Sequence, residues 1–298
     1  MEVVRRGFEP YSAGWHIDRV AVFDPRSLKR HPGPVEDFVE GLTSRALGAA
    51  VRRGKFLWLP LADTPERRGE ALVCHLGMSG QVLLGEHAEQ FGPLLRVCLE
   101  LSGPEDQSIT WGFVDQRLFG SLALDSLVDT TEGVPAGCGS EDSRIPSQVA
   151  HIARDLLDPA ADLPAIARVI RKKSSGIKRV LLDQTVTSGI GNIYADEALF
   201  LAQLHYDYPA KKLSHTRALE LLRATQEVFA RALEQGGTSF DWQYVNVNGQ
   251  SGYFSQSLNA YGQNGRPCSR CGRTIVREAF MNRSSFRCPR CQPRPRVR

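Results

Sequence analysis

The sequence predicts an α+β protein, with an N-terminal β-sandwich domain and flanking helix followed by a helical domain and a cysteine-braced β-hairpin. Three observations predict this fold class. Short β-prone runs, separated by Gly, Pro and charged turns, occupy residues 1–125. A helical period begins at Ser147, and two C-x2-C pairs lie near the end of the sequence. With 298 residues, the chain is long enough for two domains and a small appended module.

The sequence opens on a segment, Glu2 to Phe8, that has the pattern of an amphipathic helix. Val4 and Phe8 lie four positions apart on one face, and Arg5 and Arg6 point elsewhere. No Ser, Thr, Asp or Asn precedes the segment as an N-cap, so this helix lacks the usual first turn.

The β-rich region, residues 1–125, contains six runs whose spacing suits a sandwich or barrel. These runs are Val20–Phe23, Lys55–Leu59, Leu72–Leu76, Gln81–Leu84, Leu95–Leu101 and Ile109–Val114. Residues 126–150 are rich in Gly, Ser, Pro, Asp and Glu, a composition that indicates a linker or exposed loop.

The helical domain is expected over residues 151–235. Its predicted helices are Leu163–Ile170, Gly176–Asp183, Asn192–Gln203 and Ser214–Gln235, with Ser214 as an N-cap. Residues 236–265 follow as a long Gly-rich loop, and such a loop within a compact chain is more often functional than passive.

The seven cysteines fall into two groups. Cys74, Cys98 and Cys138 are scattered, and the first two lie in apolar runs that predict buried thiols. The other four are Cys268, Cys271, Cys288 and Cys291, in the pattern C-x2-C, sixteen residues, C-x2-C. This spacing predicts one structural Zn²⁺ site that braces a hairpin over residues 266–298, with Arg283 near its turn. Disulfides are the competing interpretation, but a reducing cytosol disfavours them.

Charge is concentrated at the end of the chain. The net charge is +4, and the last 33 residues hold ten arginines against a single acid, Glu278. A module this basic is typical of proteins that bind phosphate backbones. No run approaches eighteen apolar residues, and the N-terminus is too charged for a signal peptide. We therefore expect a cytoplasmic protein with a nucleic-acid partner and no membrane partner.

The stretch from Gln184 to Ala198 predicts a helix, a Gly-hinged turn and a second helix. Asn192 begins the second helix, where free N–H groups and the helix dipole favour an anion. Gly189 and Gly191 would let a phosphate approach the backbone closely. The pattern fits a helix–turn–helix variant that grips DNA phosphates, although a plain turn between core helices would also explain it.

Taken together with the cysteine hairpin, a series of ordered motifs resembles the formamidopyrimidine-DNA glycosylases along essentially the whole chain. The matching segments are Val3–Gly7, Arg53–Phe56, His75–Gly80, Asp115–Gly120, Gly189–Glu197, Gly236–Ser239, Gly252–Phe254, Tyr261–Gly262 and the cysteine module. The resemblance implies a bacterial, nucleoid-associated base-excision repair enzyme, a monomer with a helix-two-turn-helix motif. Such an enzyme is a DNA glycosylase and AP lyase that removes 8-oxoguanine and formamidopyrimidines from damaged double-stranded DNA by base flipping and β,δ-elimination.

The resemblance also implies roles for individual residues. Met78 and Phe119 would fill the gap left by the flipped base, and Arg117 would pair with the stranded cytosine. The residues implied to hold DNA phosphates are Lys55, His75, Lys178, Asn192 and Arg283. Of these, Lys55 and Arg283 would also assist strand cleavage and so count as catalytic. Residues 236–265 would be the lesion-recognition loop.

One departure from the family pattern concerns the start of the sequence. In the family the mature chain begins Pro-Glu-Leu-Pro-Glu-Val, and then continues with a segment like Glu2–Gly7. The proline amine is the nucleophile that forms a Schiff base with the sugar, and the adjacent glutamate acts as acid and base. Those six residues are absent here. Either the start has been assigned too far downstream, or the protein binds lesions without excising them.

A third possibility is a zinc-ribbon DNA-binding protein with no enzymatic history. It explains the basic tail and the four cysteines. It does not explain why Met78, Arg117 and Phe119 accompany the Gly189–Asn192 turn.

Overall fold

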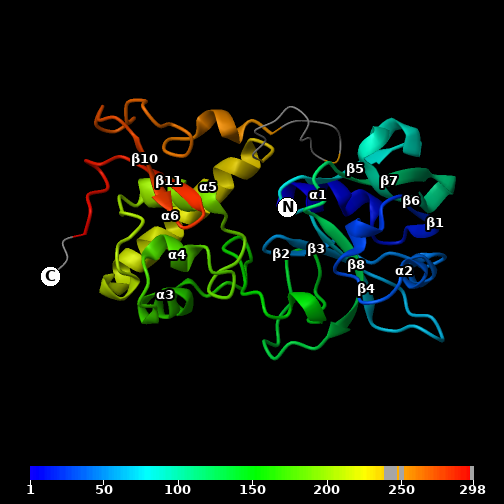
Figure 1. The fold of residues 1–298 in the computed structure, drawn as a ribbon. Helices are drawn as coiled ribbons and strands as arrows, with labels where there is room; N and C mark the ends of the chain where they lie inside the picture. The colour runs from blue at the N-terminus through cyan, green and yellow to red at the C-terminus, as the bar shows by residue number, and fades with distance from the viewer. Residues whose placement is uncertain (238–246, 248–251, 296–298) are drawn as a thin grey trace. The chain divides into compact units, whose positions relative to one another are not determined.

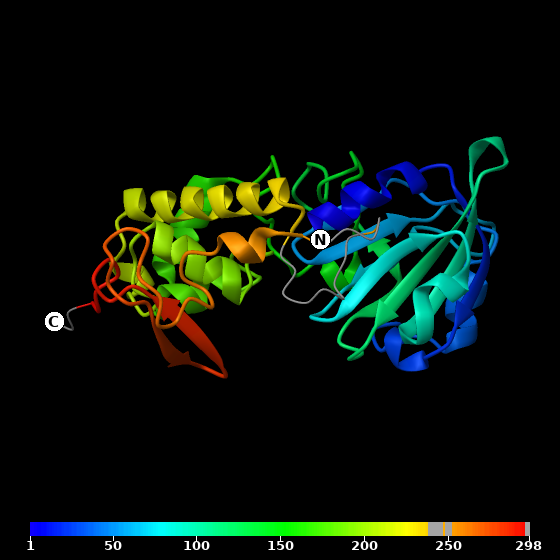
Figure 2. The same cartoon turned by 90° about the horizontal axis from the view of Figure 1, so that it is seen from above.

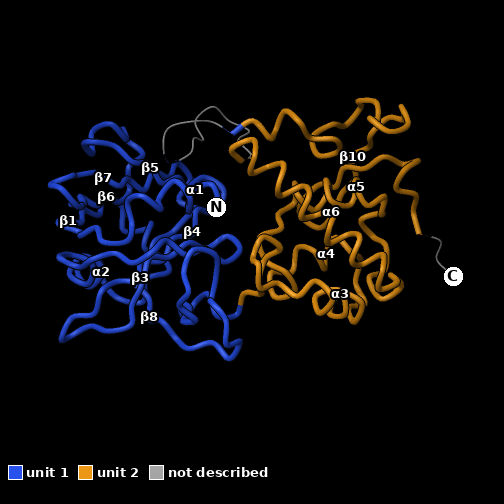
Figure 3. The backbone as a smooth tube through the Cα atoms, turned by 180° about the vertical axis from the view of Figure 1, so that it is seen from behind, with its two compact units in different colours: residues 1–151, 239–252 blue, residues 152–238, 253–298 orange. Residues whose placement is uncertain are grey.

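The computed structural model describes residues 1–237, 247 and 252–295. The chain forms two compact units, shown in different colours in Figure 3. Unit 1 comprises residues 1–151 and 239–252, and unit 2 comprises residues 152–238 and 253–298. In the described part of the chain, no helix is both long and apolar enough to cross a membrane.

Unit 1 contains two antiparallel sheets (Figure 1). One has the strand order β1-β6-β7-β5 and the other β2-β3-β4-β8-β9. The bounds of the first set are β1 His16–Val22, β5 Gly80–Gly85, β6 Leu95–Ser102 and β7 Ser108–Asp115. Those of the second are β2 Val51–Arg53, β3 Phe56–Pro60, β4 Glu70–His75, β8 Ser121–Val128 and β9 Ile145–Pro146. Helices α1 (Glu2–Phe8) and α2 (Val35–Leu42) complete the unit.

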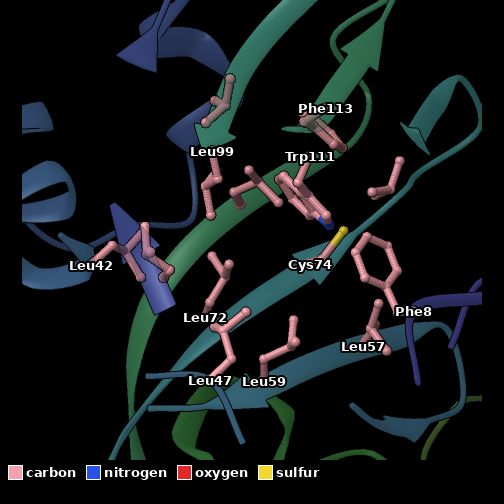
Figure 4. Packing of buried hydrophobic residues seen from close by; sticks show 14 of the residues in the cluster. Phe8, Leu42, Leu47, Leu57, Leu59, Leu72, Cys74, Leu99, Trp111 and Phe113 are labelled. Carbon is pink, nitrogen blue, oxygen red and sulfur yellow. The ribbon is translucent and has the colours of Figure 1, made fainter. Parts of the chain in front are cut away.

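The larger hydrophobic cluster described in unit 1 takes side chains from both sheets, as expected for a sandwich (Figure 4). Leu57 and Cys74 come from one sheet, Trp111 and Phe113 from the other, and all four are buried. The ring of Phe8 lies 5.7 Å from that of Trp111, so α1 packs on this core. The prediction of a β-sandwich with a flanking helix is confirmed.

The opening helix α1 buries Val4 and Phe8, as the sequence predicts. Arg5 differs from the prediction, because it is buried too and donates to Glu2. Arg52 of β2 also reaches Glu2, at 2.7 Å. Burial alone would raise the pKa of Glu2, but hydrogen bonds and charge from Arg5 and Arg52 outweigh it and hold the pKa at about 2.

The segment 126–150, predicted to be a linker, is instead part of unit 1. Strand β9 pairs with β8, and Ile145 is buried. Cys138 exchanges backbone hydrogen bonds of 2.9 Å with Arg52. The polar composition of this segment is accommodated because its backbone completes the sheet while most of its side chains remain at the surface.

Unit 2 is helical, with a two-stranded hairpin (Figure 2). Its elements are α3 Leu163–Lys172, α4 Ile177–Leu181, α5 Asn192–Leu201, α6 His215–Glu234, β10 Val276–Phe280 and β11 Arg283–Arg287. The hydroxyl of Ser214 accepts from the N–H of Arg217 at 3.1 Å, so the predicted cap of α6 is confirmed. Short 3-10 helices occur at Glu9–Tyr11, Pro25–Leu28, Ala88–Leu94, Pro104–Asp106, Ser147–Val149, Ala210–Lys212 and Phe254–Ser257.

The predicted lesion-recognition loop, residues 236–265, lies only partly within the described residues. Residues 238–246 and 248–251 fall outside them. Val247 is buried in the core of unit 1, where its carbonyl accepts from the N–H of Leu84. The segment from Tyr253 onward belongs to unit 2, and Phe254 and Leu258 pack against α6.

Candidate nucleic-acid interface

Two loops of unit 1 bring together side chains that are far apart in the sequence. Met78 lies in the β4–β5 loop and is 71% exposed, and Phe119 lies in the β7–β8 loop and is 40% exposed. The loops touch at Gly77, where a Cβ atom would lie 2.5 Å from the carbonyl oxygen of Phe119. Gly77 also has φ +62°, so both the space and the backbone conformation require glycine.

Arg117 lies in the same β7–β8 loop as Phe119. Its guanidinium lies 4.6 Å from the centre of the Phe119 ring, within the range of a cation–π contact. Leu118 between them has φ +55°, an unusual conformation for a branched side chain, and it turns the chain sharply between its neighbours. The structure thus places Met78, Arg117 and Phe119 on two touching loops.

A basic cluster surrounds the ends of β3 and β4 in the same unit. His75 ends β4, and its ring lies 4.7 Å from that of Phe56, while the guanidinium of Arg30 lies 5.3 Å from the Phe56 ring. Burial lowers the pKa of His75 to about 4, and the charges of Arg30, Lys55 and Lys29 contribute to the same shift. His75 is therefore neutral at pH 7. Since Nδ1 accepts from the N–H of Gly77, the ring proton sits on Nε2.

The turn between β2 and β3 carries Lys55, after Gly54 with φ +58°. Sequence reasoning singled out Lys55 and His75 but missed Lys29 and Arg30, whose charges act on His75. The only signal for them is the short basic run Lys29-Arg30, which is too common a pattern to be specific.

In unit 2, Asn192 is the first residue of α5, as predicted, and Gly191 is its N-cap. The Asn192 amide donates to the carbonyl oxygen of Ser284 on β11 at 3.0 Å. Gly189 has φ +85°, which lets the chain reverse between α4 and α5. The helix–turn–helix region is therefore tied directly to the hairpin.

The DNA contact predicted for Lys178 is not supported by the structure. The prediction gave it a DNA contact, but its side chain has no exposed surface and forms an ion pair with Asp196 at 2.7 Å. Its ammonium also donates to Ser284 and lies 4.7 Å from the Phe280 ring. Burial lowers the pKa of Lys178 and raises that of Asp196. The residue holds the hairpin against α4 and α5 instead of facing a phosphate.

Arg283 is exposed and begins β11, opposite Phe280 across the hairpin turn. The turn residue Met281 has φ +51° and is also exposed. Because Arg283 is exposed directly beside this turn, the hairpin presents its guanidinium to a binding partner.

The four predicted metal ligands form one cluster. The Sγ atoms of Cys268, Cys271, Cys288 and Cys291 all lie within 4.8 Å of one another. Two of the pairs, Cys268–Cys291 and Cys271–Cys288, are 4.0 and 3.5 Å apart. Four thiolates around a tetrahedral zinc ion with bonds near 2.3 Å would lie about 3.8 Å apart, so the cluster fits Zn²⁺.

Two acidic residues that sequence reasoning left without a role connect the parts of unit 2. Asp196 accepts from the Ser285 hydroxyl at 2.8 Å and from the Phe286 N–H at 3.0 Å. Glu197 accepts from the backbone N–H groups of Asn259, Ala260 and Tyr261 at 2.8 to 2.9 Å. An adjacent acidic pair in the middle of a predicted helix was the available signal in the sequence, but it did not reveal the partners.

Comparison with known families matches three consecutive parts of the chain. Residues 1–122 match the N-terminal domain of formamidopyrimidine-DNA glycosylase, and residues 152–243 match its H2TH domain. Residues 265–294 match the zinc finger found in FPG and IleRS. Among curated relatives, formamidopyrimidine-DNA glycosylase from Leifsonia xyli subsp. xyli is 55% identical over 292 residues, covering 98% of this chain and 97% of the relative. The same-named protein from Thermobifida fusca is 50% identical, covering 99% of this chain and 97% of the relative.

Solved structures give the same result. The MutM (Fpg) protein from Thermus thermophilus has 32% sequence identity and a TM-score of 0.77, covering 99% of this chain and 98% of that one. MutM in complex with DNA containing carbocyclic 8-oxo-G has 27% identity and a TM-score of 0.79, covering 98% of each chain. With its sandwich unit, its helical unit and its four-cysteine hairpin all matched, the chain belongs to the formamidopyrimidine-DNA glycosylase family of base-excision repair enzymes, which act as DNA glycosylases and AP lyases.

Proposed function

We propose that this protein recognises oxidised purines, 8-oxoguanine and formamidopyrimidines, in duplex DNA. When it carries the N-terminal proline of the family, it removes them and cleaves the resulting abasic site by β,δ-elimination. The observation that supports the proposal is that Met78, Arg117 and Phe119 lie on two loops of unit 1 that contact each other. We further propose that the protein acts as a monomer on the bacterial nucleoid.

The three side chains match the needs of a base-flipping protein. Extruding a nucleotide leaves a gap in the stack and an unpaired partner base, and both cost free energy. Met78 and Phe119 are large apolar side chains that remain exposed in the protein alone, so burying them in the gap is favourable. The guanidinium of Arg117 offers a fork of donors that suits the acceptor edge of a stranded cytosine.

Phosphate binding is proposed for residues of both units. In unit 1 these are Lys55 and His75, whose neutral ring would donate a hydrogen bond from Nε2. In unit 2 they are Asn192 at the start of α5 and Arg283 at the hairpin turn. Lys55 and Arg283 would also stabilise the phosphate that leaves during strand cleavage, because their positive charges oppose the charge that develops there.

The four cysteines would hold a Zn²⁺ ion whose contribution is structural, because four protein ligands leave no open position for substrate. In this proposal the hairpin contacts the DNA through Arg283, and the metal ion does not. Its two strands are too few to be stable alone, so the metal and the Lys178–Asp196 pair are what keep Arg283 in place.

The test is binding of the full chain to two duplexes that differ at one position. One contains a tetrahydrofuran abasic-site analogue opposite cytosine, and the other is undamaged. We expect at least about tenfold tighter binding to the first, equivalent to about 1.4 kcal/mol. Replacing Met78 and Phe119 together by Ala should remove most of this preference. Equal affinity of the unaltered chain for both duplexes would refute lesion recognition.

A further inference from the structure

Asp115, at the end of β7, is fully buried, and its carboxylate organises the β7–β8 loop. Oδ1 accepts from the N–H groups of Arg117 and Leu118 at 3.1 and 3.0 Å, and Oδ2 accepts from the N–H of Gly120 at 2.7 Å. Three backbone N–H groups of one loop therefore converge on one carboxylate. Hydrogen bonds to a charged acceptor are the stronger kind, so this loop has a defined shape.

The same carboxylate also reaches the other loop. The hydroxyl of Ser79, directly after Met78, donates to Asp115 Oδ1 at 2.5 Å, and Ser79 is itself buried. This is a side-chain hydrogen bond between residues 36 positions apart in the sequence. It lies beside the Gly77 contact, which sets how closely the two loops approach. The two contacts together fix both the spacing and the orientation of the loops.

We propose that Asp115 and Ser79 are positioning residues that couple Met78 to Arg117 and Phe119, so that the three enter the DNA stack as one rigid unit. The inference rests on the proposed function of those three side chains. Neither positioning residue touches DNA in this proposal, because both are buried.

The physical reason is preorganisation. An exposed methionine has three side-chain torsions and a flexible loop adds more, so ordering both at the moment of base flipping would weaken binding. Asp115 orders the backbone on either side of Leu118 in advance, despite its φ of +55°. The Ser79 hydroxyl transmits that order to the Met78 loop. The conformational entropy of the two loops is then lost when the protein folds, and not when it binds the lesion.

The experiment uses Ser79→Ala, which removes the link between the loops and leaves the three backbone bonds to Asp115 in place. The matched control is Ser121→Ala. Ser121 is also buried, at the other end of the β7–β8 loop, and within the described residues its hydroxyl has no hydrogen-bond partner. Both variants are measured for binding to the tetrahydrofuran and undamaged duplexes, and for thermal unfolding.

We expect Ser79→Ala to lower the preference for the abasic duplex about threefold, with little change in affinity for undamaged DNA. Ser121→Ala should retain the preference within about twofold. A loss that is equal for both duplexes, or equal in both variants, would show that Ser79 only supports the fold and would overturn the proposal. Asp115→Asn serves as a second variant with the same expectation, since it keeps the shape of the side chain but removes its charge and replaces one acceptor oxygen with an NH2 donor.

A double-mutant cycle makes the coupling itself measurable. Met78→Ala and Phe119→Ala are combined in the original chain and again in the Ser79→Ala background. In the original chain we expect their effects on lesion preference to be non-additive by about fivefold, and in the second background to be additive within about twofold. Coupling that is unchanged in the second background would overturn the proposal. If Met78→Ala and Phe119→Ala have no effect in either background, the proposed function fails first, so the two failures are distinguishable.

Discussion

The ammonium of Lys178 lies 2.7 Å from the carboxylate of Asp196, and the two side chains are 0% and 1% exposed. This ion pair joins α4 to α5, and each partner continues to β11, through the carbonyl of Ser284 and the hydroxyl of Ser285. Asn192 shares the Ser284 carbonyl with Lys178. The turn proposed to hold one phosphate and the hairpin proposed to hold another are thus built on a common buried charge pair.

Replacing Lys178 by Ala should destabilise unit 2 severely. Removing one partner leaves the Asp196 carboxylate buried without its ion pair, and such a change typically costs about 3 to 5 kcal/mol. Chemical unfolding measures the loss, and Lys172→Ala, an exposed lysine in α3, is the control expected to change stability by less than about 0.5 kcal/mol. A Lys178→Ala protein as stable as the control would contradict the structural role.

Arg117→Ala should reduce discrimination of the base opposite the lesion. Without the guanidinium the stranded cytosine loses its donors, while Met78 and Phe119 still fill the gap. We expect the preference for cytosine over adenine opposite a tetrahydrofuran site to fall about tenfold, in line with the discrimination of about 1 to 3 kcal/mol typical of a paired arginine. Competition binding measures this preference. Arg19→Ala, an exposed arginine on β1, is the control, and an equal effect of both changes would rule out a specific role for Arg117.

Chelation of zinc should weaken DNA binding while leaving unit 1 folded. The hairpin β10–β11 has two strands and depends on the four-cysteine cluster, so Arg283 loses its fixed position when the metal is removed. The described tryptophans, Trp15, Trp58 and Trp111, all lie in unit 1, and their fluorescence reports on that unit. We expect affinity for the abasic duplex to fall at least about tenfold with fluorescence nearly unchanged. Collapse of the fluorescence on chelation would show that zinc supports the whole chain.

The sequence predicted those features whose interacting residues lie close together along the chain, and it missed those whose partners are distant. The four cysteines, the Ser214 cap and the apolar strands were recognisable because spacing and alternation are local properties. Strand β2 is missing from the predicted strands because its consecutive arginines, Arg52 and Arg53, break the apolar alternation of a strand. Their burial depends on Glu2 and Glu132, which lie 50 and 79 positions away. The prediction of a DNA contact for Lys178 was wrong for the same reason. Its carboxylate partner, Asp196, comes from another helix, and in the sequence such a lysine cannot be distinguished from a surface lysine.

The pH dependence of stability should reveal the buried Glu2 cluster. The pKa of Glu2 is held at about 2, below its ordinary value of 4.5, so the folded state binds fewer protons than the unfolded state between these values. The stabilisation is therefore complete above pH 4.5 and is lost as the pH falls toward 2. A shift of this size corresponds to about 3 kcal/mol. Comparing Glu2→Gln with the original chain, we expect a stability difference at pH 7 that largely disappears near pH 2.5. A difference that is constant with pH would mean that Glu2 is not ionised in the folded protein.

The chemistry of base excision can be tested by placing Pro-Glu-Leu-Pro-Glu-Val, the head that the family resemblance implies, directly before Glu2. Helix α1 begins at Glu2, and Val4 and Phe8 anchor it in the core of unit 1. Added residues would therefore extend from a fixed point. The exposed proline amine should then form a Schiff base with an abasic site, which borohydride reduction converts into a covalent protein–DNA complex.

The matched control carries Ala in place of the first Pro and keeps the other five added residues. We expect trapping and strand cleavage from the proline form, and a reduction of at least about a hundredfold in the alanine form, because a primary amine in the same place is a different nucleophile. Lys55→Ala in the proline form separates the steps, since Schiff-base trapping should persist while strand cleavage slows. Equal trapping by the proline and alanine forms would show that the secondary amine of the proline is not required for the reaction.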